Sequence, residues 1–405
     1  MAVWVSLIFG FTYVGLIVCG HPRSPLARWQ VALLGAFCVL AIQAISLSQA
    51  WQSISWDIIG ILFGLMVISG YMHQAGILDA LAKKIITRMR HQRQVLLALI
   101  IIAAVGSAFL TNDVVCLILA PMVITLCQRY EMAPMPFLLG VALASNAGSV
   151  ATLSGNPQNI IIGVYSGIPY ARFFLTMAPL ACVSVLVNYF LLRIIFRQSL
   201  AMPIKVVDEI SKPVESARAE IGIFAIVVVL FFSPLPMWLP ALVGAVVLLC
   251  YRNRKPDFWR TINLPLLLLF VGFFVLVDAM DKQVVHNWHI DDWPGIQSDP
   301  GAFVAVFAPV FSNIFSNVPL TLLFKSLIQY FDNPEYIWLM LSASCTLAGN
   351  ATLFGSFANM IVAEQARPYG IQMGYLTFLR VGVLSAIITI VCAYLYLTYV
   401  VVTFQ

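Results

Sequence analysis

The chain has 405 residues, of which 61% are hydrophobic and 10% are charged. Soluble domains usually have about 45–50% apolar and 25% charged residues, so this composition excludes an ordinary soluble protein and indicates a polytopic membrane protein. The formal net charge is +5, and the basic residues gather in short connections, which argues against a nucleic-acid-binding surface.

Apolar segments alternate with short polar connections along the whole chain. The first seven lie at about residues 3–19, 29–50, 57–73, 94–110, 112–129, 136–163 and 173–196. Seven more follow a polar linker and lie at about residues 219–233, 237–251, 264–280, 301–315, 317–331, 336–363 and 373–402. The first segment has no basic region before its apolar run, so we interpret it as a membrane span and not as a cleaved signal peptide.

The charges of the connections predict which segments cross the membrane. Basic residues cluster in the first connection and at 83–93 and 252–260, and the positive-inside rule places these connections in the cytoplasm. The acidic connection 281–299 is expected on the outside. Both assignments hold if residues 94–129 and 301–331 are re-entrant helical hairpins, each entering and leaving on one side. We therefore predict ten spans and two hairpins in a bacterial inner membrane, with both termini in the periplasm.

An internal repeat relates the two halves of the chain. The sequences SVATLSGNPQNII and GNATLFGSFANMI match at an offset of 200, at Ala151, Thr152, Leu153, Gly155, Asn159 and Ile161 and at Ala351, Thr352, Leu353, Gly355, Asn359 and Ile361. Each half has five spans, an odd number, so the second copy must be inverted relative to the first. The sequence thus predicts an all-α polytopic membrane protein with two inverted repeats, residues 1–200 and 219–405, joined by a cytoplasmic linker at 201–218. Each repeat contains one hairpin and one broken helix, the latter at about 136–163 or 336–363.

Small and polar residues interrupt both broken helices and both hairpin tips. Glycine and proline loosen a helix, and the unwound backbone then presents carbonyls to a cation and N–H groups to an anion. We expect a site for a substrate or an ion, with one half-site from each repeat. The first half-site comprises Thr111, Asn112, Asp113, Thr152, Ser154, Gly155, Asn156 and Asn159, and the second comprises Ser316, Asn317, Val318, Thr352, Gly355, Ser356 and Asn359. The alternative is that these residues cap and pack membrane helices.

Asp113 is the carboxylate that this topology places near the bilayer centre. A charged side chain there costs at least about 2.5–3.5 kcal/mol, which a bound cation or proton would offset. We therefore expect Asp113 to be the coupling residue, and Na⁺ is a candidate ligand of the hairpin tips and broken helices. The alternative is a partly hydrated side chain that caps the tip. Asp278 and Lys325 lie nearer the ends of their segments and are expected to snorkel or to pair near the interface.

The remaining clusters do not indicate a cofactor or a resident metal. The eight cysteines lie in or beside apolar segments without CxxC spacing, so we expect them to pack as small apolar residues. His286 and His289 stand near two aspartates, but neighbouring tryptophans make this segment more typical of a membrane interface. Residues 74–93 are interpreted as a surface helix whose basic face meets anionic lipid. The sequence has no P-loop, which argues against a pump driven by ATP.

The motifs FLTNDVVCLILAPMVITL, ASNAGSVATLSGNPQNIIIG, FSNVPLTLLF and AGNATLFGSFANMIVAEQA resemble a known group of transporters. The chain is similar to the ion transporter superfamily, on the branch of arsenite permeases, citrate-transporter-like proteins and divalent anion/sodium symporters. The resemblance covers nearly the whole chain and implies an elevator mechanism and a homodimer. The symporters carry Ser-Asn-Thr at both tips, whereas the tips here end in Asp113 and Val318, which puts carboxylate recognition and sodium coupling in question.

These observations predict a secondary active transporter for a small anion or oxyanion, coupled to H⁺ or Na⁺. Two other transport functions stay open, an arsenite or antimonite efflux permease driven by the proton gradient and a passive anion channel. A membrane-embedded enzyme would need a cluster of His, Glu or Cys at membrane depth, and the five scattered histidines do not provide one.

Overall fold

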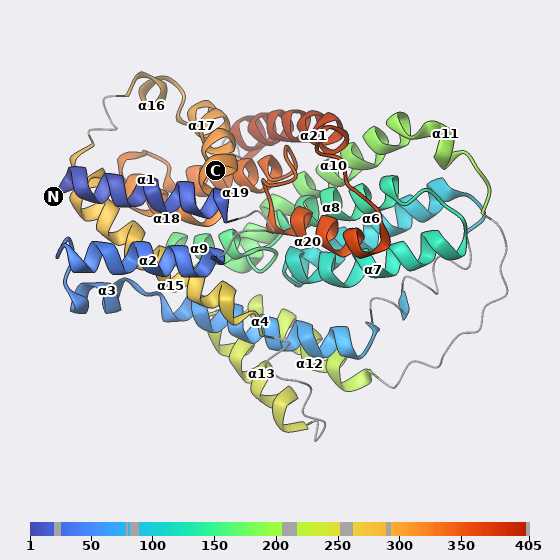
Figure 1. Ribbon diagram of the computed structural model, residues 1–405, viewed down its shortest axis with the longest axis horizontal. Helices are drawn as coiled ribbons and strands as arrows, with labels where there is room; N and C mark the ends of the chain where they lie inside the picture. Colours follow the sequence, from blue (N-terminus) through green and yellow to red (C-terminus); the bar gives the residue numbers. More distant parts are fainter. Residues whose placement is uncertain are drawn as a thin grey trace.

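Figure 1 shows the computed structural model of the chain, whose described residues are 1–19, 26–77, 80–81, 89–204, 217–251, 262–288 and 293–401. Every element of these residues is helical. Six of their helices are long and apolar enough to cross a membrane, judged by length and composition, and five more apolar helices are shorter. The expected all-α polytopic fold class is confirmed.

The described residues of the first half form helices of 4 to 26 residues. Its elements are α1 (Ala2–Val18), α2 (Arg28–Ala41), α3 (Leu47–Ser53), α4 (Trp56–Gln74), α6 (Gln92–Phe109), α7 (Asn112–Arg129), α8 (Met135–Ser149), α9 (Pro157–Ser166), α10 (Tyr170–Ile195) and α11 (Arg197–Leu200).

The described residues of the second half also form helices. Its elements are α12 (Arg218–Phe231), α13 (Trp238–Tyr251), α15 (Leu264–Gln283), η1 (Val285–Asn287), α16 (Pro294–Ser298), α17 (Pro300–Phe315), α18 (Asn317–Leu327), η3 (Ile328–Tyr330), α19 (Pro334–Ala348), α20 (Phe357–Ala366), η4 (Arg367–Tyr369), α21 (Tyr375–Tyr396) and η5 (Leu397–Val401).

Each half contains two helices joined by a tight turn and a second pair separated by a short non-helical stretch. A two-residue turn joins α6 to α7, and Ser316 alone joins α17 to α18. Residues 150–156 separate α8 from α9, and residues 349–356 separate α19 from α20. Figure 1 places α6 and α7 on the right of the view and α17 and α18 on the left, so the two hairpins belong to opposite ends of the molecule. That they are re-entrant, and that the halves are inverted, stay predictions.

One segment is divided where the sequence suggested a continuous span. Residues 29–50 form α2 and then α3, and Gln43 between them has a φ of 56°. Ser46 stops any continuation of α2 because it caps α3, with Gln49 N donating to its Oγ at 3.2 Å and its own N donating to Gln49 Oε1 at 2.8 Å.

Matched glycines let helices of one half pack closely on helices of the other. α2 packs on α15, and α13 packs on α4. A Cβ on Gly272 of α15 would lie 2.7 Å from the carbonyl carbon of Ala32, and one on Gly64 of α4 would lie 2.6 Å from that of Ala241. Small residues of this kind allow membrane helices to approach each other. Of these four helices, α15 also contributes residues to the wall of the cavity between the hairpin tips and the broken helices.

Several sequence predictions concern residues outside the described ranges. They include the basic residues at 83, 84, 88 and 252–260, most of the linker at 201–218, and the acidic part of the segment that follows η1. The basic surface helix expected at 74–93 lies largely among them.

Candidate functional site

A small cavity of about 50 Å³ lies where the two hairpin tips meet the two broken helices. The first residues of four helices line it, namely Asn112 of α7, Pro157 of α9, Asn317 of α18 and Phe357 of α20. The first turn of a helix has N–H groups without intrahelical partners and the positive end of the helix dipole. Leu266, Leu269, Phe270 and Phe273 of α15 complete the wall. We call this space the central cavity.

The central cavity brings together eight of the fifteen residues expected from the sequence. These are Asn112, Asp113, Asn156, Ser316, Asn317, Val318, Gly355 and Ser356. Seven others do not line it, namely Thr111, Thr152, Ser154, Gly155, Asn159, Thr352 and Asn359. Most of these seven hold the interrupted backbone in place behind the cavity, as their hydrogen bonds show.

Two asparagines at matched positions bind the ends of the broken helices. Asn159 Nδ2 donates to the carbonyl oxygens of Ser149 and Thr152, each at 3.0 Å. Asn359 Nδ2 donates to the carbonyl oxygens of Gly349 at 2.7 Å and Thr352 at 3.0 Å. The last carbonyls of a helix have no intrahelical partner, so each amide satisfies oxygens that the interruption exposes. The same geometry at an offset of 200 explains why the sequence repeats here.

Each hairpin tip is fixed to the broken helix of its own half. The backbone N of Asn112 donates to the carbonyl oxygen of Gly155 at 2.9 Å, and Thr152 Oγ1 donates to the carbonyl oxygen of Ala108. In the second half Asn313 takes this role, since its Nδ2 donates to the carbonyl oxygen of Ala348 and its Oδ1 accepts from Thr352 Oγ1, both at 3.0 Å. Asn313, which lies one turn before the tip, was not among the predicted site residues.

Hydrogen bonds also cross between the halves at matched positions. Asn156 Nδ2 donates to Thr346 Oγ1 at 3.2 Å, and Ser356 Oγ donates to Asn146 Oδ1 at 2.9 Å. Asn146, Thr346 and Gln158 line the central cavity and were not predicted. A polar residue inside an otherwise apolar half-helix, at the same offset of 200, was the available signal for the first two.

The central cavity carries one ionisable side chain, the half-buried Asp113, among its lining residues. The Oδ1 atom of Asn317 is buried and has no hydrogen-bond partner among the described residues. Ser316, beside it, has a φ of 73° and a ψ of 153°, a conformation that side chains other than glycine rarely adopt. The carboxylate of the first tip and the unpaired amide oxygen and strained backbone of the second tip suit a ligand that donates hydrogen bonds or carries positive charge.

Two larger cavities also have walls from α15. The Arg28 cavity, of about 680 Å³, shares Leu269, Phe273, Ser316, Gly355 and Phe357 with the central cavity. The Lys325 cavity, of about 420 Å³, meets α15 further on, at Phe274, Val277, Asp278, Asp281 and Lys282, and shares none of the residues lining the central cavity. The central cavity therefore adjoins the Arg28 cavity and shares no wall with the Lys325 cavity.

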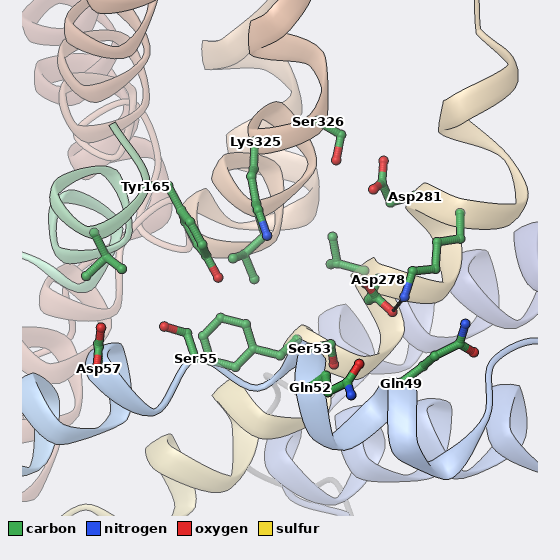
Figure 2. A pocket seen from close by; sticks show the side chains of 15 residues that line it. Gln49, Gln52, Ser53, Ser55, Asp57, Tyr165, Asp278, Asp281, Lys325 and Ser326 are labelled. Atoms are coloured by element: carbon green, nitrogen blue, oxygen red, sulfur yellow. Dashed lines mark hydrogen bonds and ion pairs between the residues drawn. The ribbon is translucent and has the colours of Figure 1, made fainter. Parts of the chain in front are cut away.

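The Lys325 cavity has charged walls from different elements. Figure 2 shows Lys325 of α18 and Tyr165 of α9 on one side and Ser55 and Asp57 of α4 across from them. Lys325 Nζ lies 4.4 Å from the centre of the Tyr165 ring, and Asp278 accepts from Lys282 at 2.7 Å. The expected pairing of Asp278 is present, whereas Lys325 stacks on an aromatic ring.

The structure combines apolar helices that can cross a membrane with two interrupted helices, and a polar cavity lies among the ends of the interrupted helices. This combination is typical of a membrane transporter. The chain belongs to the citrate transporter family, CitMHS, whose family model matches residues 13–333. This confirms the resemblance to the ion transporter superfamily that the motifs indicated. The chain is thus a multi-pass transporter of the CitMHS and arsenite-permease type.

Full-length relatives support this assignment. The chain is 25% identical to the putative transporter arsB of Dictyostelium discoideum, over 95% of this chain and 89% of that protein. It is 28% identical to the silicon efflux transporter LSI3 of Oryza sativa, over 89% of this chain and 90% of that protein. The crystal structure of the Alcanivorax borkumensis YdaH transporter matches with a TM-score of 0.60 over 98% of this chain and 97% of that one, at 13% identity, which shows the fold alone.

Proposed function

We propose that this chain is a secondary active transporter in a bacterial inner membrane, which moves a small oxyacid or its anion together with H⁺ or Na⁺. The observation that carries the proposal is the convergence of four helix N-termini on a cavity with a single carboxylate. Helix N-termini favour the oxygens of an anion or an acid, and Asp113 provides a group that can take a proton or a cation. The central cavity thus offers groups suited to the substrate and groups suited to the coupling ion of a secondary transporter.

The size and charge of the central cavity favour a compact solute over a tricarboxylate. Its volume of about 50 Å³ is far below the roughly 300–1,000 Å³ of sites for drug-sized ligands. Its lining residues include no lysine or arginine, the groups that usually bind carboxylates in pairs of hydrogen bonds. Amides and hydroxyls both donate and accept, and they match the hydroxyl groups of a small undissociated or singly charged oxyacid.

A second candidate function, efflux of arsenite or antimonite, follows from the same observation. Arsenous acid, the hydrated form of arsenite, and its trivalent antimony counterpart are small and uncharged near neutral pH, so a site without basic side chains does not disfavour them. The relatives named as a putative arsB transporter and a silicon efflux transporter point in this direction. The direction of transport and the coupling ion belong to the proposal in both cases.

In an elevator movement, one group of helices would slide against a second group. The hairpins and broken helices carry most of the central cavity, while α15 contributes an apolar wall and packs on α2. The Arg28 and Lys325 cavities lie at different stretches of α15, so a slide of the first group along α15 would open the central cavity to one and close it to the other. We expect this movement in each subunit of a homodimer.

Purified protein in sealed liposomes tests the proposal. Arsenite, silicic acid, phosphate, sulfate and citrate are offered in turn, under an imposed pH gradient and then under an imposed Na⁺ gradient. A thermal-unfolding screen with the same solutes comes first, because a ligand that binds the folded state raises its stability. We expect one of the small oxyacids to accumulate above its equilibrium level under one gradient.

Two other results would redirect the assignment. Flux that stops at equilibrium under both gradients would indicate a passive channel. Accumulation of citrate, without any of the smaller solutes, would show that the cavity expands to take a tricarboxylate and would contradict the substrate class proposed here.

A further inference from the structure

Asn146 uses every hydrogen-bonding position of its side-chain amide. Its Oδ1 accepts from Asn112 Nδ2 and from Ser356 Oγ, both at 2.9 Å. Its Nδ2 donates to Asn350 Oδ1 at 2.9 Å and to Asn359 Oδ1 at 3.1 Å. An amide has two donors and two acceptor positions, so no capacity is left over. The side chain is 1% exposed, and its four partners are all side chains.

The four partners of Asn146 belong to two different parts of the site. Asn112 is the first residue of α7 at the first hairpin tip, while Ser356, Asn350 and Asn359 belong to the second broken helix. Asn146 itself lies in α8, the first segment of the first broken helix. One amide group therefore connects a hairpin tip of the first half to the interruption of the second half, more than 200 residues away in sequence.

Two of these partners also line the central cavity. Asn112 and Ser356 share the single oxygen atom Oδ1 of Asn146, and both face the space where a ligand would bind. A ligand that bonds to either side chain changes the hydrogen bond that side chain makes to Oδ1. Hydrogen bonds in a buried network polarise one another, so the bond from the other side chain changes too.

We propose that Asn146 is a positioning residue that couples the two half-sites, so that engagement of ligand at the first hairpin tip sets the geometry of the second broken helix. The proposal rests on the central cavity being the transport site. In this role, Asn146 links the first hairpin tip to the second broken helix through a single side-chain amide.

A mutant cycle in two backgrounds tests this role. Asn112→Ala, Ser356→Ala and the double variant are measured in the parent protein and again with Asn146→Ala. The readout is the half-saturation concentration for arsenite flux into liposomes. In the parent background the effect of the double variant should differ from the product of the single effects by about fivefold or more, as residues of one network usually do. In the Asn146→Ala background the effects should multiply to within about twofold.

Equal coupling in both backgrounds would overturn the proposal, and so would multiplicative effects in the parent. A merely structural role predicts lower thermal stability of Asn146→Ala with the coupling unchanged. If Asn146→Ala does not fold, Asn146→Leu carries the test, because leucine has a similar size and shape. Leucine has no polar atom to accept from Asn112 and Ser356, and the coupling should fall in the same way.

Asn188 provides the matched control. It is a fully buried amide that also joins the halves, donating to the carbonyl oxygen of Leu143 at 3.1 Å and accepting from Ser385 Oγ, but it does not line the central cavity. Asn188→Ala should lower thermal stability and leave the coupling between Asn112 and Ser356 intact. Loss of coupling in this variant would show that any buried amide between the halves has the effect attributed to Asn146.

A reporter that needs no substrate separates this proposal from the proposed function. Phe357 is the first residue of α20 in the second broken helix and lines the central cavity. The maleimide reaction rate of Phe357→Cys, followed on its own peptide by mass spectrometry, should change at least about threefold on adding Asn112→Ala, and should not change when Asn146→Ala is also present. This result would support the role of Asn146 even if no solute were transported. An unchanged rate in the parent would contradict it.

Discussion

At the scale of single residues, Asp113 decides whether the site can couple transport to an ion gradient. Its side chain lines a cavity whose other polar groups are neutral amides and hydroxyls. Asp113→Asn keeps the shape and removes the ability to lose a proton or to neutralise a cation. We expect this variant to fold, to retain substrate binding in thermal-unfolding assays, and to lose accumulation of substrate above equilibrium in liposomes.

The dependence of transport on pH and on Na⁺ identifies the ion that Asp113 carries. If it carries a proton, Asp113→Asn should remove the response of flux to external pH, because asparagine mimics the protonated acid. If it holds Na⁺, the variant should lose the stabilisation that Na⁺ gives to the folded state and keep its response to pH. Accumulation equal to that of the parent would show that Asp113 only caps the hairpin tip.

The sequence located the residues at the hairpin tips and at the interruptions, and missed those inside continuous helical segments. Asn112 and Asn156 lie where helices are interrupted, and a polar residue at such a place in the membrane indicates a binding or structural role. Asn146 lies in a continuous helical segment, where its role depends on partners more than 200 residues away. A single sequence carries no signal for such distant pairing, so the cross-connections required the structure.

At the scale of elements, the close crossings of α2 on α15 and of α4 on α13 should control stability. Gly272→Val would place side-chain atoms where the backbone of Ala32 lies, at 2.7 Å from the new Cβ. We expect a loss of at least about 1–3 kcal/mol, the usual cost of an overpacked interior, measured as a lower thermal-unfolding midpoint in detergent. Gly64→Val should behave alike at its contact with Ala241.

Gly222 supplies the control for this prediction. It lies within α12, and a Cβ there would meet nothing within 4 Å. Gly222→Val should therefore leave the unfolding midpoint near that of the parent. A similar loss for Gly222→Val and Gly272→Val would mean that the effect comes from helix propensity and not from the close crossing.

The interrupted elements could be located from sequence better than the continuous ones. Gly155, Asn156 and Pro157 break a helix for reasons that residue chemistry dictates, and the structure ends α8 and begins α9 around them. The break after α2 has a less direct marker, the capping box that Ser46 and Gln49 form at the start of α3. The positive φ of Gln43, which lies between the two helices, has no such marker in the sequence.

At the scale of the whole molecule, a re-entrant hairpin predicts that both of its ends are accessible from the same side of the membrane. Arg90 and Glu131 are exposed residues just outside the two ends of the α6–α7 pair. If the hairpin is re-entrant, Arg90→Cys and Glu131→Cys should react with a membrane-impermeant maleimide from the same side in intact cells or inverted vesicles. Labelling of the two positions from opposite sides would show that α6 or α7 crosses the membrane alone, and the topology of ten spans would fail.

The Lys325 cavity provides the test of movement between the two groups of helices. Lys325 comes from α18, a helix of the hairpin, and Asp281 comes from α15, and both line this cavity of about 420 Å³. If the elevator slide closes the cavity, these walls approach each other and opposite charges meet. A disulfide forms only when two Cα atoms come within about 7 Å. We therefore expect the pair Lys325→Cys and Asp281→Cys to cross-link under mild oxidation, to stop flux into liposomes, and to recover on reduction.

Pairs within one helix separate this movement from damage by oxidation. Asp278 and Lys282 lie one turn apart on α15 and line the same cavity. Oxidation of Asp278→Cys with Lys282→Cys should leave flux unchanged, because neither position moves relative to the other during a slide of whole helices. If the pair at 325 and 281 fails to cross-link under any gradient, or if the cross-linked protein transports normally, the Lys325 cavity does not close during the cycle. The central cavity would then have to open by a movement that does not bring α18 closer to α15 at the Lys325 cavity.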